Sequence, residues 1–207
     1  MTGVSELLVS SPVEPWQQIG LRVVNGVSWI GGIALRFIPV TAGTAPQLTA
    51  WTLVGSPSTP PTIDGLTTTY VDDVEPQFWD HPLGATVFDH VVVMTSSVQR
   101  TCAEITLVTG EPLKRVREAG PVRQGFHRLG SMIVEVVESD RVMPAAASFW
   151  GFVLVVDDIH EISDRLGPDV LAAPRPAVQS GRLISSFRAT AGLGLPIALM
   201  SPHVRGG

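Results

Sequence analysis

The sequence predicts an α+β protein assembled from repeated units of one strand, one helix and three further strands. Three observations support this fold class. The chain has 20 Gly and 17 Pro among 207 residues, which favours many short elements joined by tight turns. Apolar stretches of strand length recur between those turns. The order of elements after residue 86 repeats after residue 148, which indicates an internal duplication.

The composition limits the size, the partners and the compartment of the protein. Hydrophobic residues make up 44% and charged residues 16%, which suits a sizeable core in one large or two small domains. The net charge is −5 without a basic stripe, so we expect no nucleic-acid binding. A single cysteine, Cys102, fits a reducing cytoplasm. The N-terminus lacks a basic stretch followed by an apolar one, and no apolar run approaches about 20 residues. We therefore expect no signal peptide and no membrane span.

The first 85 residues are expected to form strands around one short helix. The helix covers residues 14–20, with Trp16 facing inward and Gly20 as its stop. Asn25 and Gly26 have the chemistry of a two-residue hairpin turn. The expected strands cover residues 5–10, 21–24, 27–30, 32–40, 48–54 and 66–71, before a turn-rich boundary over 72–86.

The remainder contains two helices, each of which follows an apolar strand. Ser96 or Ser97 can cap the first helix, and Asp157 or Asp158 the second, because short polar side chains satisfy the free N–H groups of a first helical turn. The helices are expected over residues 98–108 and 159–166. The expected strands cover residues 87–94, 113–118, 124–129, 132–137, 149–156, 182–189 and 196–200.

The two units keep a common register. His90 lies 45 residues before Glu135, and Gly151 lies 47 residues before Ala198, which allows a two-residue insertion within 190–194. Residues 5–39 show the same order in shorter form and are expected to be a third, abbreviated copy. The expected domains are an abbreviated N-terminal segment, 1–85, and a main domain, 86–207, with modules 86–140 and 148–202.

These patterns resemble the vicinal oxygen chelate superfamily, the glyoxalase-like proteins, and in detail the actinobacterial glyoxalase-like type. The stretches that carry the resemblance are Phe88-Asp89-His90-Val91-Val92-Val93, Arg123-Gln124-Gly125-Phe126, Ile133-Val134-Glu135-Val136-Val137 and the copy that begins at Phe149. The resemblance implies paired modules whose curled sheet forms a concave cup, with helices on the convex face. It also implies a metal ligand on the first and on the last strand of each module. The ion they hold would act on a substrate as a Lewis acid.

His90 and Glu135 stand at the two ligand positions of the first module. Because side chains two residues apart share one face of a strand, both are expected to face the cup. A carboxylate within an apolar strand is costly unless it is solvated, paired or metal-bound. The second module offers only Gly151 and Ala198, so two protein ligands remain where catalytic zinc usually has three.

Three nearby donors could complete a divalent metal site: His127, Gln124 or Glu6. We favour the alternative in which His90 and Glu135 hydrogen-bond each other, or water, in a pocket without metal.

The expected ligand is a small molecule. Its pocket is expected to include Gln124, Phe126, Trp150 and His127 beside His90 and Glu135, although His127 alone also fits a surface position. The basic cluster of Lys114, Arg115 and Arg117 is interpreted as a solvated face.

Three hypotheses follow for function. The first is proton transfer next to a carbonyl with Glu135 or His90 as base, in a lyase or isomerase-type reaction. The second is a non-catalytic, metal-free binder, as in the bleomycin resistance-like use of this fold. The third is a structural protein whose cup is filled by its own side chains. Paired modules in this family often come from two chains, so a homodimer is an alternative to pairing within the chain.

Overall fold

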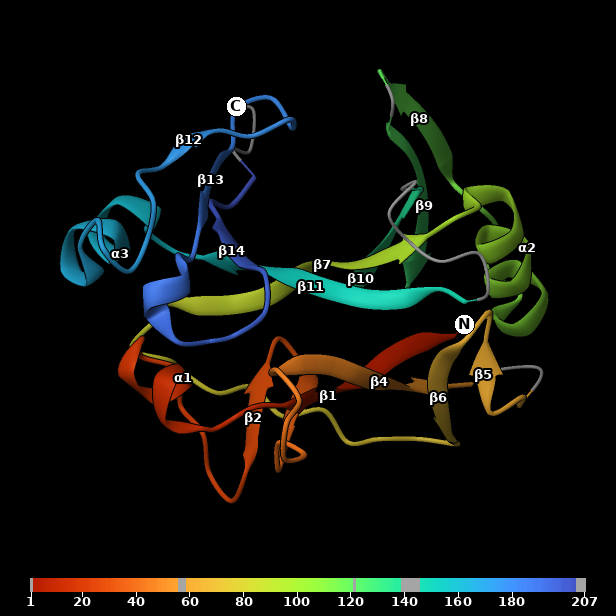
Figure 1. Ribbon diagram of the computed structural model, residues 1–207, viewed down its shortest axis with the longest axis horizontal. Helices are drawn as coiled ribbons and strands as arrows, with labels where there is room; N and C mark the ends of the chain where they lie inside the picture. The colour runs from red at the N-terminus through yellow and green to blue at the C-terminus, as the bar shows by residue number, and fades with distance from the viewer. Residues whose placement is uncertain (1, 56–58, 121, 139–145, 204–207) are drawn as a thin grey trace.

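Two curled β-sheets lie back to back in the computed structural model, which describes residues 2–55, 59–120, 122–138 and 146–203 (Figure 1). The N-terminal sheet has the strand order β2-β3-β1-β4-β6-β5. The C-terminal sheet has the order β12-β13-β14-β11-β7-β10-β9-β8. The described helices are too short or too polar to cross a membrane.

The N-terminal half supplies one sheet and one short helix. Its elements are β1 (Gly3–Ser10), α1 (Glu14–Gln18), β2 (Val27–Ile30), β3 (Ile33–Ile38), β4 (Gln47–Val54), β5 (Thr62–Ile63) and β6 (Leu66–Val71).

The C-terminal half supplies the larger sheet and both longer helices. Its elements are β7 (Ala85–Thr95), α2 (Val98–Thr109), β8 (Arg115–Ala119), β9 (Val122–Leu129), β10 (Met132–Glu138), β11 (Ser148–Val156), α3 (Ile159–Leu166), β12 (Arg175–Pro176), β13 (Leu183–Ser186), the 3₁₀ turn η1 (Ala189–Ala191) and β14 (Ile197–Met200).

The predicted duplication is confirmed in the C-terminal sheet. In the first module β7 runs parallel to β10, which is followed by β9 and β8. In the second module β11 runs parallel to β14, which is followed by β13 and β12. The two first strands, β7 and β11, pair antiparallel at the centre. The helices begin at the predicted caps, where the side chain of Ser97 accepts from the Arg100 N–H and that of Asp158 from two N–H groups.

The N-terminal sheet contains two reduced copies of the module, where the sequence predicted one. Strand β1 runs parallel to β3, and β3 pairs with β2. The first copy therefore keeps its helix and lacks one strand. Strand β4 runs parallel to β6, which pairs with β5, and the described residues of this second copy form no helix. The predicted strand over residues 21–24 is wrong. Only the single bridge from Val24 to Val27 forms there, around the expected turn, where φ is positive at Asn25 and Gly26.

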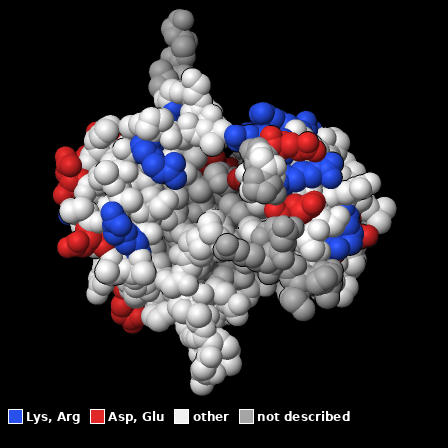
Figure 2. Space-filling model, turned by 45° about the horizontal axis from the view of Figure 1, so that its top comes forward, with Lys and Arg blue, Asp and Glu red and all other residues white. Residues whose placement is uncertain are grey.

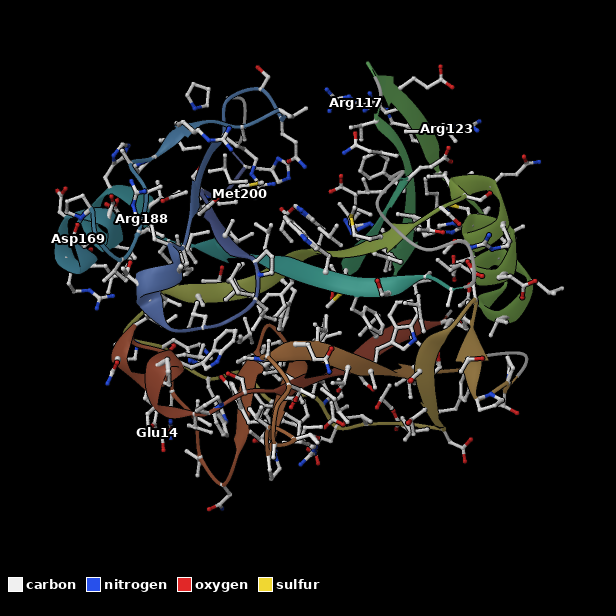
Figure 3. All side chains as sticks on the ribbon, viewed as in Figure 1. Glu14, Arg117, Arg123, Asp169, Arg188 and Met200 are labelled. Carbon is white, nitrogen blue, oxygen red and sulfur yellow. The ribbon has the colours of Figure 1, made fainter. Side chains whose placement is uncertain are left out.

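The hydrophobic core fills the space between the two sheets (Figure 3). Trp16 is fully buried and stacks on Phe152 of β11, with ring centroids 5.9 Å apart. Trp51 of β4 is equally buried and meets Phe149 of β11 edge-on at 5.3 Å. The N-terminal sheet therefore covers the convex face of the C-terminal sheet, between α2 and α3, whereas β8, β9, β12 and β13 rise on the opposite side (Figure 1).

Candidate functional site

A cavity of about 820 Å³ opens on the concave face of the C-terminal sheet. Its walls come from both modules, with His90, Gln124 and Glu135 from the first and Ile184 and Met200 from the second. This volume lies within the range of small-molecule sites. The third hypothesis, a cup filled by its own side chains, does not fit a cavity of this size.

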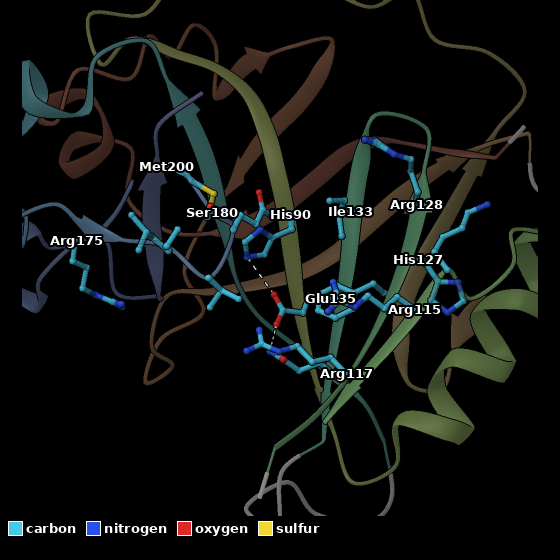
Figure 4. Close-up of a pocket in the computed structure, with 17 residues that line it drawn as sticks. His90, Arg115, Arg117, His127, Arg128, Ile133, Glu135, Arg175, Ser180 and Met200 are labelled. Atoms are coloured by element: carbon cyan, nitrogen blue, oxygen red, sulfur yellow. Dashed lines mark hydrogen bonds and ion pairs between the residues drawn. The ribbon is translucent and has the colours of Figure 1, made fainter. Parts of the chain in front are cut away.

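His90 and Glu135 come together in this cavity, as the alternation of the strands predicts. Their neighbours Val91 and Val134 are fully buried on the opposite face. The His90 Nε2 atom lies 3.4 Å from Oε2 of Glu135, and both side chains are about one-seventh exposed. Gln124 of β9 donates from Nε2 to Oε1 of Glu135 (Figure 4). The carboxylate is thus paired on both oxygens and still reaches the cavity.

Asp89 also points toward His90, which the alternation did not predict. Strand β11 pairs Val153 with His90 and Leu154 with Phe88, so Asp89 is an extra residue in β7. Such a bulge redirects a side chain that would otherwise point to the other face. Asp89 Oδ2 accepts a hydrogen bond from His90 Nδ1 at 2.8 Å. The bulge therefore lets Asp89 and His90, although adjacent in sequence, point to the same side of the sheet.

Arg182 holds the second oxygen of Asp89. Its Nη1 donates to Oδ1 of Asp89 and to Oε1 of Gln179, each at 2.6 Å, and its Nε donates to the Ser201 carbonyl at 2.8 Å. The Arg182 side chain is 1% exposed. Burial alone would raise the pKa of Asp89. The hydrogen bonds and charges of His90 and Arg182 outweigh burial, and the pKa lies below its ordinary value of 3.8.

The ionised Asp89 determines how His90 is presented. An ionised carboxylate can only accept a hydrogen bond, so the Nδ1 atom that donates to it carries a proton. The Nε2 atom then faces Glu135. At 3.4 Å the Nε2 atom lies within ion-pair distance of the Glu135 carboxylate, so a charged imidazole could pair with it. The two side chains therefore place an acid–base couple within the cavity.

Of the predicted pocket residues, His127 lines the cavity and Trp150 does not. His127 is 1% exposed, which rules out the surface position, and its Nδ1 lies 3.3 Å from the Glu111 carbonyl oxygen rather than near His90. Burial lowers the pKa of His127. Trp150 is 51% exposed and is not among the described residues that line the cavity. It is the extra residue of a second bulge, between Phe149 and Gly151 of β11. Gln124 and Phe126 do line the cavity, as predicted.

The residues present do not fit a divalent metal ion. Gly151 lies seven residues before the cap Asp158, as His90 lies seven before Ser97, so the two occupy equivalent positions. A Cβ atom at Gly151 would lie 1.9 Å from the Pro196 carbonyl oxygen, so a side chain there would require the backbone to shift. In the described part of the chain, no three His, Cys, Asp or Glu side chains are arranged to bind a metal.

None of the three candidate donors is free to complete a metal site. Gln124 is hydrogen-bonded to Glu135, and His127 lies at the Glu111 carbonyl oxygen. The Glu6 carboxylate forms an ion pair with Arg36 at 2.7 Å in the N-terminal sheet, away from the cavity. We therefore derive no chemical step through a metal.

The second module contributes an apolar floor in place of ligands. Met200, Ile184 and Ala177 line the cavity, and the buried Val153 and Ala198 pack against them. The cavity thus combines an acid–base couple from the first module with an apolar surface from the second.

Comparisons with known proteins support the fold. No family model matches the chain, and no curated protein matches it in sequence. A variant of 4-hydroxymandelate synthase from Streptomyces coelicolor is similar in structure, with 14% identity, 99% of this chain and 94% of that chain covered, and a TM-score of 0.64. Methylmalonyl-CoA epimerase from Mycobacterium tuberculosis matches with 14% identity, 59% and 91% coverage, and a TM-score of 0.48. The chain therefore has the vicinal oxygen chelate fold.

Proposed function

We propose that the protein binds a small carbonyl compound in the cavity and transfers a proton at the carbon next to the carbonyl, without a metal. The arrangement of Glu135 carries this proposal. Its carboxylate lies within an apolar strand, reaches the cavity and is held by Gln124 and His90. A partly buried carboxylate in apolar surroundings is costly to maintain, and a proton-transfer role accounts for it.

The side chains have complementary roles in this reaction. Glu135 accepts the proton from carbon, and the electron pair of the broken C–H bond moves toward the carbonyl oxygen to form an enolate. His90, protonated at both nitrogens, donates a hydrogen bond from Nε2 to that oxygen and stabilises the negative charge that develops there. Asp89 holds the ring through Nδ1, at 2.8 Å. Return of a proton to the same carbon restores the carbonyl compound, so the step exchanges the carbon-bound hydrogen with no net change in atoms.

Exchange of the carbon-bound hydrogen tests the proposal. The protein is incubated in deuterium oxide with a panel of 2-oxo acids and branched acyl thioesters, and deuterium incorporation next to the carbonyl is followed by NMR. Glu135→Gln should lower the exchange rate by about 10²–10⁴-fold, the usual contribution of a general base. Glu161→Gln, on the exposed first turn of α3, serves as the control and should leave exchange unchanged. Equal exchange in the Glu135→Gln protein would exclude Glu135 as the base.

A metal-free binder without catalysis is the second candidate. The loss of donors at Gly151 and Ala198 and the apolar floor beside them favour it. Two results together would favour this candidate over the first. A ligand should raise the melting temperature even in chelator and in the Glu135→Gln protein, and the wild type should show no hydrogen exchange.

A further inference from the structure

We infer that the ligand is an organic anion, with a carboxylate or phosphate group at the mouth of the cavity and an apolar body on its floor. This inference rests on the proposed binding site and names the class of molecule that the site takes. It depends on the charges that surround the cavity rather than on the acid–base couple within it.

Basic residues outnumber acidic ones in the lining of the cavity. Among the described residues that line it, five are basic and Glu135 is the one acidic residue; the basic residues are Lys114, Arg115, Arg117, Arg128 and Arg175. The whole chain has a net charge of −5, so this is a local concentration against the overall sign. Figure 2 shows Lys and Arg atoms on both sides of the hollow in this face. A concave site lined by one sign of charge attracts ligands of the opposite sign.

The register of the strands places the arginines of β8 on the cavity face. Arg115 pairs with Phe126 of β9, which pairs with Glu135 of β10. Arg117 pairs in the same way with Gln124. Directly paired residues point to the same face of a sheet, so these side chains share the concave face. Arg117 and Arg175 lie on opposite sides of the cavity, with His90 and Glu135 between them (Figure 4).

The five basic residues that line the cavity, the rim cations, have no ion-pair partners among the described residues. Some arginines elsewhere do: Arg36 pairs with Glu6, Arg100 with Asp64 and Arg123 with Glu118. The side chain of Arg128 donates to the Ser131 carbonyl oxygen, which leaves its charge uncompensated. A guanidinium group matches carboxylate and phosphate through two parallel hydrogen bonds. An anionic ligand would therefore supply the missing charge.

The depth of each group orients the ligand. Lys114, Arg115 and Arg175 are exposed at the mouth, whereas Met200 is buried at the floor. Figure 3 shows Arg117 and Met200 on different walls above the C-terminal sheet. A molecule with an anionic end and an apolar body satisfies both surfaces.

Calorimetric titration with matched pairs of probes tests the inference. Phenylacetate is compared with phenylacetamide, and phenyl phosphate with phenol. At least one anion should bind about tenfold more tightly than its neutral partner, because hydrogen bonds to charged groups contribute more than neutral ones. Added salt should weaken the binding of that anion only. The preferred anion identifies the group as carboxylate or phosphate. Neutral probes that bind as tightly as the anions, or a panel on which no anion binds, would overturn the inference.

A double variant tests whether the rim cations bind the anion. Arg115→Gln combined with Arg117→Gln should weaken anion binding about tenfold or more. Arg123→Gln is the matched control, because Arg123 lies on the adjacent strand, is paired with Glu118 and lies on the outer side of β9 (Figure 3). Equal losses in both variants would contradict a role for the rim.

The experiments distinguish failure of the proposed function from failure of the inference. Anion binding without hydrogen exchange would contradict the proton-transfer function and would still support an anionic ligand. Hydrogen exchange on a neutral carbonyl compound, bound without preference for charge, would contradict the anionic ligand and would still support the function.

Discussion

At the scale of single residues, Asp89 links the site to the stability of the fold. It is 9% exposed and joins His90 to the buried Arg182. The Asp89→Asn substitution would leave the Arg182 charge without a counterion, and removing one partner of a buried pair costs about 3–5 kcal/mol of the free energy of unfolding. Urea unfolding at neutral pH measures this loss.

The same substitution has a defined pH dependence. The folded-state pKa of Asp89 lies below its ordinary value of 3.8. Its stabilising contribution is therefore present above pH 3.8 and is lost as the pH falls through the folded-state pKa. The difference between wild type and Asp89→Asn should narrow in that acid range. The double variant Asp89→Asn with Arg182→Met should recover part of the stability, and a difference that stays constant down to acid pH would contradict the assignment.

His81 gives a second pH dependence, nearer to neutrality. Its Nδ1 accepts from the Arg22 N–H at 3.1 Å, and its Nε2 lies 2.9 Å from the Trp29 carbonyl oxygen. Only the neutral ring makes both contacts, and burial lowers its pKa from 6.5. The unfolded chain then takes up the proton first, so stability should fall as the pH drops below 6.5 toward the folded-state pKa.

The substitution His81→Gln tests this dependence. The melting temperature is measured against pH in both proteins, and the slope below pH 6.5 should be shallower in the variant. The slope should not vanish, because His127 is also buried with a lowered pKa. A slope equal to that of the wild type would contradict the role of His81.

Residues of the candidate site differ in how far the sequence could predict them. The pairing of His90 with Glu135 follows from strand alternation and was predictable. Asp89 was not, because its bulge depends on the register with β11. Arg182 contacts Asp89 across 93 residues of sequence, and no local pattern indicates that contact. The basic cluster at 114–117 fits a solvated strand equally well until the curl of the sheet turns it toward the cavity.

At the scale of elements, Gly151 controls the contact between β11 and β14. A Cβ atom there would lie 1.9 Å from the Pro196 carbonyl oxygen, so Gly151→Ala must push the two strands apart. We expect a loss of about 1–3 kcal/mol in the free energy of unfolding, the usual cost of overpacking. Gly3→Ala on β1 is the control, since its nearest atom would be 3.6 Å away. Chemical denaturation compares the two variants, and equal stability would show that β14 can move freely.

Helix ends were more predictable than short strands for a physical reason. Caps such as Ser97 and Asp158 act through local hydrogen bonds, which the sequence displays directly. Strands β5 and β12 have two residues each and exist only because a neighbouring strand offers a free edge. The expected strand over 21–24 lacks such a partner apart from the bridge at Val24.

At the scale of the whole molecule, one core joins what the sequence divides into two domains. The buried cluster extends without interruption from Leu7 and Trp51 of the N-terminal sheet to Val91 and Phe152 of the C-terminal sheet. The sequence predicted the two complete modules because each retains its helix and its strand order. The second reduced copy, β4 to β6, shows no helix in its described residues, and so it lacks the periodic signal that reveals a module.

A shared core predicts cooperative unfolding of the two sheets. Trp16 is fully buried and contacts both Phe37 of β3, at 5.4 Å, and Phe152 of β11, at 5.9 Å. Trp16→Ala should cost about 3–5 kcal/mol and shift the whole transition without splitting it. A fragment of residues 86–207 would expose the convex face that Trp16 and Trp51 cover, so it should show no sharp thermal transition. Calorimetry on the full chain, the variant and the fragment measures each effect. Cooperative melting of the fragment alone would instead make residues 1–85 a separate folding unit, in agreement with the domain boundary that the sequence predicts.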